Sequence, residues 1–268
     1  MTTPSFHVYG LATPLVRTGD DMATHILAAA ERSESRGVQA GDIVVVAESA
    51  VATAEGRVAR LAEIEPSAEA LRLAEDYRMD PHLVEVVLRE SDRVVGGIPG
   101  FLLCMKNGTL LPNAGIDASN APPGSVVLLP ADPDASAQGI RATIRERSGV
   151  DVGVIVIDSR THAMRLGCSG VAIGCSGIPS VLDERGKSDL FGRELEVTKR
   201  AVADCIASAA ELVMGEAGEC VPAAVVRGIG LPVGDYTGVA TIDASECLFM
   251  GVALHTDPAL LVDNKRKS

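Results

Sequence analysis

Acidic and polar side chains of the types that hold metal ions or nucleotides gather in three places along the chain. The first is the segment from Asn113 to Asn120, which contains Asp117 and precedes a Pro-Pro-Gly turn. A carboxylate such as Asp117 can ligate a hard cation, and an amide such as Asn120 can bind a nucleotide. The same composition is typical of an Asx-rich turn, so the residues alone leave both interpretations open.

Asp158 and Ser159 form the second group, directly after the apolar run from Val152 to Ile157. Functional side chains collect at the carboxyl ends of strands in α/β sheets, and a carboxylate beside a hydroxyl suits a hard cation. Asp and Ser are also common caps of helices and turns, which is the alternative for this pair.

The third group, from Leu212 to Glu219, lies where an expected helix ends at Gly215. It contains Glu216 and Glu219, and carboxylates are unfavourable near the negative end of the helix dipole. A bound cation would give them a partner. The alternative is a solvated acidic helix end.

Several familiar motifs are missing from the sequence. It contains no Walker phosphate loop, no G-x-S-x-G elbow and no H-E-x-x-H pair. The six cysteines include no C-x-x-C pair, which indicates reduced and mostly buried thiols rather than a zinc knuckle. Neither a serine hydrolase nor a zinc protease is therefore expected.

Composition limits the partners of this 268-residue chain. Its net charge of −12 argues against nucleic acid or an anionic membrane, but not against a nucleotide whose phosphates a metal ion neutralises. Met1 to Thr18 lacks the charged and apolar regions of a signal peptide, and no apolar run reaches the roughly 18 residues of a membrane span. We therefore expect a cytoplasmic protein.

The elements that must position these groups are a mixture of strands and helices. We expect strands at 6–11, 43–47, 93–95, 101–105, 126–129, 152–157, 172–175 and 221–226, and helices at 19–35, 66–77, 81–89, 135–148 and 190–215. Without a strict βαβ order, a repeat or a linker, this predicts a mixed α/β (α+β) fold. We expect one domain over residues 1–258 and a polar tail over 259–268.

Ten segments, taken in order, resemble the coenzyme F420:L-glutamate ligase family over about residues 6–230. They are 19–21, 41–47, 54–57, 88–91, 113–120, 130–137, 189–198, 201–204, 211–216 and 225–228. The resemblance implies an unusual fold of two intimately packed lobes and a homodimer. It also implies addition of L-glutamate to a deazaflavin precursor with GTP, two Mg²⁺ or Mn²⁺ ions and help from K⁺.

The resemblance also carries roles onto particular residues. It implies metal ligands at Asp117, Asp158, Ser159 and Glu216, and catalytic roles for Asp117, Asp158 and Arg165. It implies that the nucleotide, GTP or alternatively ATP, lies against Thr13, Pro14, Leu15, Val16, Glu48, Ser49, Thr53, Asn120, Leu212, Val213, Met214, Gly215, Glu216, Ala217, Gly218 and Glu219. The expected chemistry is transfer of the γ-phosphoryl group to a carboxylate, which makes an acyl phosphate that an amine attacks.

Two departures from the family pattern bear on the substrates. Thr53 stands where a lysine is usual, and Thr161-His162 replaces a Gly-Arg pair, although Arg165 and Gly167 remain. Three hypotheses follow: the coenzyme F420 ligase, a paralogue that joins an amino acid to a different carboxylate, and a non-catalytic binder of nucleotide or deazaflavin.

Overall fold

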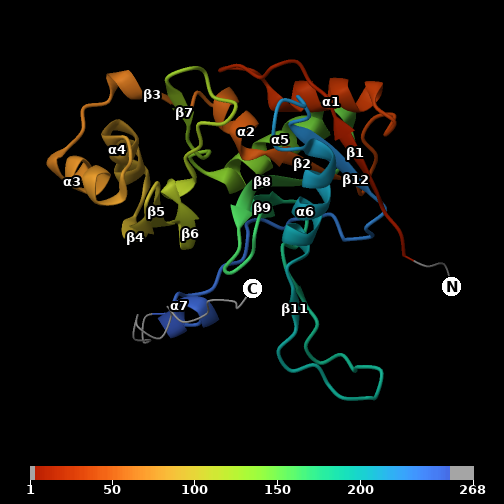
Figure 1. Cartoon of the computed structure of the whole chain (residues 1–268). Coiled ribbons are helices and arrows are strands. Elements are labelled where there is room, and N and C mark those ends of the chain that lie inside the picture. Colours follow the sequence, from red (N-terminus) through yellow and green to blue (C-terminus); the bar gives the residue numbers. More distant parts are fainter. Residues whose placement is uncertain (1–3, 254–268) are drawn as a thin grey trace, which may run out of the picture.

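The larger lobe of the protein is built on a five-stranded sheet, shown in the computed structural model of Figure 1, which describes residues 4–253. Its strands lie in the order β1 (His7–Leu11), β12 (Ala223–Arg227), β2 (Ile43–Ala47), β8 (Gly153–Thr161) and β9 (Cys168–Ser176). Only β2 and β8 pair in parallel, so their carboxyl ends lie at the same edge of the sheet. That edge carries the site described below.

Helices cover both faces of this sheet. On one face lie α1 (Met22–Arg32), α2 (Glu48–Ala54) and α5 (Pro133–Ser148), and on the other lies α6 (Val202–Met214). Val44 and Val46 point to the first face, whereas Ile43 and Val45 point to the second, and all four are buried. The continuous apolar run at 43–47 is therefore the signature of a strand buried on both sides.

Helix α1 begins where the acidic residues at 20–21 predicted a helix start. The Asp21 carboxylate accepts bonds from the backbone N–H groups of Ala23 and Thr24, at 3.0 and 3.5 Å. Helix α5 is capped in the same way by Asp132, and it ends at Gly149, whose φ of 71° suits glycine.

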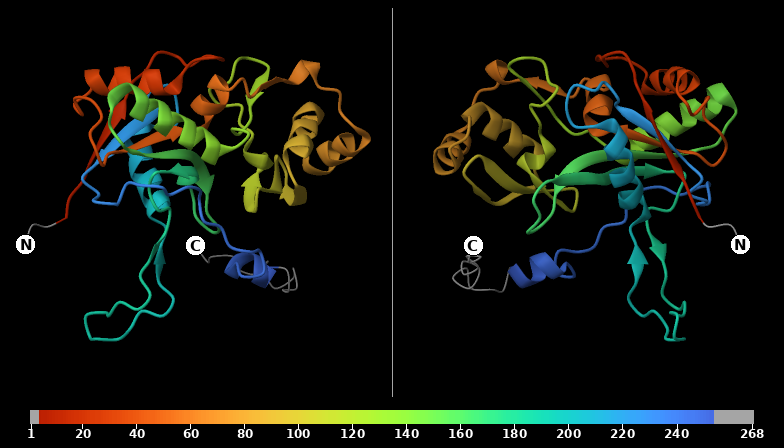
Figure 2. Two further views of the ribbon diagram at one scale, coloured as in Figure 1. Left: turned by 180° about the vertical axis from the view of Figure 1, so that it is seen from behind. Right: turned by 45° about the vertical axis from the view of Figure 1, so that its right-hand side comes forward.

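A smaller lobe has a core of its own. It contains α3 (Ala68–Tyr77), α4 (Pro81–Glu90) and a three-stranded sheet of β4 (Arg93–Ile98), β5 (Phe101–Lys106) and β6 (Thr109–Pro112). The short pair β3 (Val58–Arg60) and β7 (Ser125–Val127), with the 3-10 turns η1 (Leu61–Glu63) and η2 (Asn113–Gly115), connects the lobes. Figure 2 shows this lobe beside the large sheet from two further directions. The predicted mixed α/β fold with two packed lobes is confirmed.

Glu90 forms ion pairs with two basic side chains where the lobes meet. Its Oε2 accepts bonds from the Arg57 guanidinium at 2.7 Å and from Lys106 Nζ at 2.6 Å. Arg57 also donates to the carbonyl oxygen of Leu129 at 3.1 Å. All three charged side chains of this cluster are thus partnered, and Lys106 is buried.

The predicted helix over 190–215 is wrong in its first half, because helix α6 begins only at Val202. Residues before it form an arm closed at its base by β10 (Leu182–Asp183) and β11 (Lys199–Arg200), and the arm projects from the body in Figures 1 and 2. Asp189 breaks the helical pattern, since its carboxylate accepts bonds from the N–H groups of Phe191 and Arg193 and closes a turn.

Other differences from expectation are smaller. Strands β8 and β9 are longer than predicted, and helices α2 and α7 (Leu248–Ala253) were not expected from the sequence. Cys168, Cys205 and Cys220 are exposed, so the expectation of mostly buried thiols is wrong, although the cysteines are free. No helix in the described range 4–253 is long and apolar enough to cross a bilayer. The expected tail at 259–268 lies outside the described residues.

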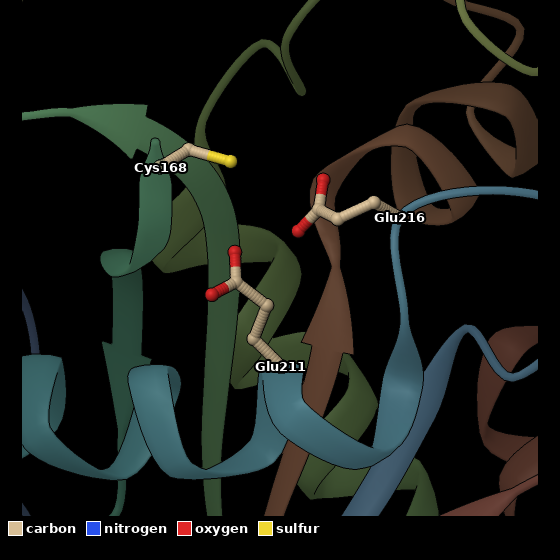
Figure 3. A group of neighbouring side chains, drawn as sticks. All are labelled: Cys168, Glu211 and Glu216. Carbon is tan, nitrogen blue, oxygen red and sulfur yellow. The ribbon is translucent and has the colours of Figure 1, made fainter. Parts of the chain in front are cut away.

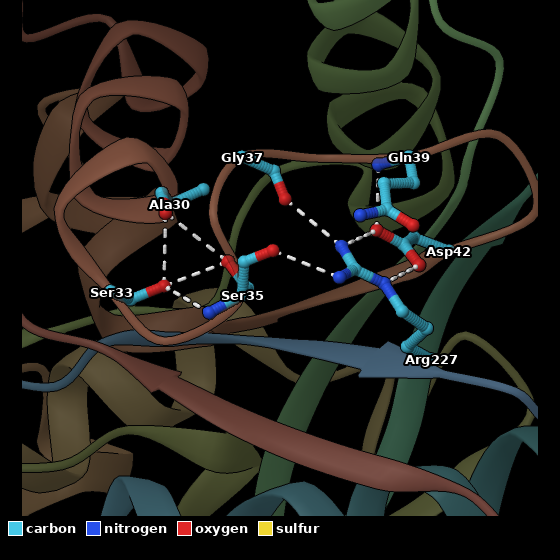
Figure 4. A network of polar contacts seen from close by, with 7 residues as sticks. All are labelled: Ala30, Ser33, Ser35, Gly37, Gln39, Asp42 and Arg227. Carbon is cyan, nitrogen blue, oxygen red and sulfur yellow. Dashed lines mark hydrogen bonds and ion pairs between the residues drawn. The ribbon is translucent and has the colours of Figure 1, made fainter.

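A buried ion pair fixes the loop that leads from α1 into β2 (Figure 4). The Arg227 guanidinium bonds both carboxylate oxygens of Asp42, at 2.8 and 2.7 Å, and the carbonyl oxygens of Ser35 and Gly37. The backbone N–H of Gln39 donates to the same carboxylate at 2.7 Å. Every member has a partner, which is the condition for a stable buried charge.

Candidate active site

A cleft of about 760 Å³ opens at the carboxyl ends of β2 and β8. Its walls come from α2, from the loop after η2 in the smaller lobe, from the end of β8, and from the loop between α6 and β12. Ligands of α/β proteins bind at this kind of sheet edge. The cleft therefore lies at the end of the strand where the sequence predicted Asp158 as a functional residue.

The structure brings together the predicted metal ligands in this cleft: Asp117, Asp158, Ser159 and Glu216 all line it. Asp117 is held by two backbone hydrogen bonds to Val127, at 3.1 and 2.8 Å, and Asp158 and Ser159 lie on β8 itself. Glu216 follows Gly215, where α6 ends with a φ of 76°. Asp117 and Glu216, which lie far apart in the sequence, thus share one cavity.

Most of the residues expected near a nucleotide also line the cleft. They are Thr13, Pro14, Leu15, Val16, Glu48, Ser49, Thr53, Asn120, Met214, Gly215, Ala217, Gly218 and Glu219. Leu212 and Val213 do not, and their side chains are exposed on α6. Arg165 is also outside the lining, in the exposed turn between β8 and β9, where its N–H bonds the His162 carbonyl oxygen at 3.1 Å.

Glu48 has the most perturbed carboxyl group of the predicted set. It is the first residue of α2, directly beyond the end of β2. Burial, followed by repulsion from Asp158, raises the pKa of Glu48 to about 8. Burial also raises the pKa of Asp158, and the Arg160 guanidinium opposes this effect only in part.

Arg160 is the single cationic side chain among the described residues that line the cleft, against six carboxylates. Its Nε lies 3.0 Å from Asp158 Oδ2, and both side chains are largely buried. Arg160 directly precedes Thr161-His162, the pair that departs from the family motif. In the structure it lies against a carboxylate of the cleft.

Glu211 is a member of the cleft that the site prediction missed. Burial and the nearby Glu216 carboxylate raise the pKa of Glu211 to about 7. It lies on the last turns of α6, which approaches β9 closely because Gly170 lacks a side chain: a Cβ there would be 2.6 Å from the Ala207 carbonyl oxygen. The signal in the sequence was a carboxylate in the last turns of a largely apolar helix, whose other carboxylate, Asp204, lies in the first turn.

The donors of the cleft fit divalent cations of the Mg²⁺ and Mn²⁺ type. Such ions prefer carboxylate and hydroxyl oxygens, and Asp117, Asp158, Ser159 and Glu216 supply both. Burial, and then repulsion among the carboxylates, raises the pKa values of Glu48 and Asp158. A bound cation would remove that repulsion.

Comparison with known proteins identifies the chain. The model of the F420-0:gamma-glutamyl ligase family matches residues 10–228, across both lobes and every wall of the cleft. A coenzyme F420:L-glutamate ligase of Methanopyrus kandleri is 49% identical over 80% of this chain and 83% of its own. The enzyme of the same name from Archaeoglobus fulgidus is 43% identical over 86% of this chain and 90% of its own.

The family match and the relatives named as ligases make this two-lobed protein an enzyme of the ligase class. The chain belongs to the F420-0:gamma-glutamyl ligase family.

Proposed function

We propose that this protein is a ligase that joins L-glutamate through an amide bond to the carboxylate of the deazaflavin precursor of coenzyme F420. The observation that carries the proposal is the convergence of Asp117, Asp158, Ser159 and Glu216 on one cleft. Relatives over 80% or more of the chain are named for this reaction. The proposed setting is the cytoplasm.

GTP is the proposed source of energy, with ATP as the alternative nucleotide. A carboxylate is a poor acyl donor because its leaving group would be oxide. Transfer of the γ-phosphoryl group to a carboxylate oxygen breaks the bond between the β-bridging oxygen and the γ-phosphorus, and releases GDP. The glutamate amine then attacks the acyl carbon, the amide forms, and inorganic phosphate leaves.

Two Mg²⁺ or Mn²⁺ ions, with K⁺ as a further ion, are part of the proposal. Asp117, Asp158, Ser159 and Glu216 would hold the divalent ions, which would neutralise charge on the phosphates. Asn120 and the segment Thr13–Val16, which line the cleft, would bind and orient the nucleotide. Glu48, which also lines the cleft, would lie near the nucleotide, and solvent would take the proton that the glutamate ammonium group must lose.

A direct test measures the product. The protein is incubated with GTP, Mg²⁺, L-glutamate and the precursor that carries no glutamate, and mass spectrometry is used to detect a gain of one glutamyl residue. We expect this gain together with release of GDP and phosphate. The variant Asp158→Asn, purified in the same way, is expected to give neither product.

The departures at Thr53 and His162 support a second candidate, a paralogous ligase that acts on a different carboxylate. Thr53 lines the cleft without a positive charge, and the one lining cation in the described chain, Arg160, contacts Asp158. Phosphate release that requires another carboxylic acid would favour this candidate. Nucleotide or deazaflavin binding without turnover would favour the third hypothesis, a non-catalytic binder.

A homodimer is also proposed, and the arm between β10 and β11 supports it. Leu190 and Phe191 are 99% and 88% exposed near its tip, an unfavourable arrangement for apolar side chains in water. Light scattering tests the assembly: a dimer is expected, and Phe191→Ser together with Leu190→Ser is expected to shift it toward the monomer. An unchanged dimer would show that the arm makes no contribution.

A further inference from the structure

A thiol and two carboxylates converge at one end of the cleft (Figure 3). Cys168 begins β9, Glu211 lies on α6, and Glu216 lies in the loop beyond α6. One ligand atom from each lies within 4.8 Å of the other two. Three separate elements therefore direct metal-binding atoms toward a common point.

Glu211 is held in place for this arrangement. Its Oε2 accepts a hydrogen bond of 2.8 Å from the N–H of Gly170, and the Gly170 carbonyl oxygen is itself bonded by Ser208 Oγ at 2.8 Å. Its Oε1 atom is buried and has no hydrogen-bond partner among the residues that the structure describes. A buried oxygen without a partner is costly, and a cation would satisfy it.

The chemistry of the three donors selects a class of ion. Mg²⁺ takes oxygen ligands, whereas a thiolate suits borderline ions such as Zn²⁺ and Co²⁺. Three protein ligands and an open fourth position are typical of zinc sites that bind water or substrate. The exposed Cys168 loses its thiol proton to solvent when it ligates the ion.

We propose that Cys168, Glu211 and Glu216 form a binding site for a Zn²⁺-class transition-metal ion, distinct in its donors from the oxygen-ligand site for Mg²⁺ or Mn²⁺. The site goes beyond the ligase reaction, since it uses a thiol and a carboxylate that the proposed mechanism leaves free. Glu216 belongs to both ligand sets. An ion on Cys168 therefore competes with the divalent ion of the reaction and inhibits the enzyme.

Co²⁺ is the probe for the test, because a cobalt–thiolate bond gives a charge-transfer absorption band in the near ultraviolet. The full-length protein, stripped of metal with a chelator, is titrated with Co²⁺, and a band that saturates at one ion per chain is expected. Cys168→Ser is expected to abolish the band. The matched control is Cys220→Ser, which removes another exposed thiol that lines the same cleft and should keep the band.

A second pair of variants tests the carboxylates. Glu211→Gln is expected to weaken Co²⁺ binding by about 10- to 100-fold. Glu196→Gln, which removes an exposed carboxylate of the arm outside the cleft, should leave the affinity unchanged. A missing band in the unaltered protein, or a band that survives in Cys168→Ser, overturns the proposal, whatever the ligase assay shows.

Discussion

Two groups of charged residues lie at opposite ends of β2 and differ in how their charges are balanced. Before the strand, Asp42 is almost fully buried, and five hydrogen-bonded contacts tie it, Arg227 and the preceding loop together. After the strand, Glu48 faces Asp158 and Asp117, and burial and repulsion raise its pKa to about 8. Strand β2 thus has a fully hydrogen-bonded ion pair before its first residue and a group of mutually repelling carboxylates after its last.

The difference separates stability from function. A buried ion pair whose members are fully bonded fixes a loop but has no capacity left for a ligand. A set of carboxylates with one guanidinium among the described lining residues retains that capacity, and cations can relieve its repulsion. Variants of the Asp42–Arg227 pair should change the free energy of unfolding, and variants of the cleft carboxylates should change the rate of the reaction.

The largest effect is expected for Asp158→Asn in the cleft. Loss of this carboxylate should lower glutamate-dependent phosphate release on the order of 1000-fold or more, because it removes a ligand of the proposed metal ions. Arg160 loses its charged partner while the repulsion on Glu48 falls, so the melting temperature should change less than in Asp42→Asn. Full activity in this variant would refute the assignment of the site.

The next effect is expected at the other end of the strand. Asp42→Asn leaves the Arg227 guanidinium partly buried without its charged partner, which should cost about 3 kcal/mol of unfolding free energy. That loss corresponds to a fall in melting temperature on the order of 10 °C. Thermal unfolding measures it, while kcat at a temperature well below the transition should be retained. A large loss of kcat in the folded variant would contradict the assignment of stability to one end of β2 and of catalysis to the other.

A smaller effect is expected from pH in the metal-free protein. The pKa of Glu48 is about 8 when folded and near 4.5 when unfolded, so between these values the folded chain binds the extra proton. The contribution of Glu48 to stability should therefore be complete below about pH 4.5, fall as pH rises toward 8, and then level off. Unfolding titrations at several pH values should show this slope, reduced in Glu48→Gln and reduced by added Mn²⁺.

Glu85 supplies the control for that slope. Hydrogen bonds from Ser67, followed by the Arg89 guanidinium, lower the pKa of Glu85 to about 2. Its contribution has the opposite sign and is lost only as pH falls from about 4.5 toward 2. Glu85→Gln should therefore keep the slope between pH 5 and 8. A slope that persists unchanged in Glu48→Gln would count against the raised pKa.

The smallest effect is expected for an exposed pair on the arm. Asp183 bonds the Arg185 guanidinium, and both side chains are about half exposed, at 47% and 50%. Asp183→Asn should leave the midpoint of chemical denaturation nearly unchanged, because water and salt screen such pairs. Chemical denaturation of Asp183→Asn and Asp42→Asn measures the two losses of stability. Equal losses would show that burial of the ion pair does not determine how much stability is lost.

Some of the fold was open to prediction from local pattern alone. The apolar run at 43–47 and the Asp-capped start of α1 formed as expected, because burial on two faces and a capping carboxylate act within a few residues. The helix over 190–215 failed in its first half, since its apolar side chains face water on an arm and have no core to pack against. Periodicity does not reveal whether such a core exists.

The sequence by itself determined the family, and it predicted oxygen ligands at Asp117, Asp158, Ser159 and Glu216 in their separate motifs. Only the tertiary structure decided which of the chain's many carboxylates share a cleft, and it placed Glu211 and Cys168 there while leaving Arg165 outside. The physical reason is that charge crowding, burial and pKa depend on distances through space. Residues of α2, β8, β9 and α6 meet only after the sheet has paired and α6 has packed against Gly170.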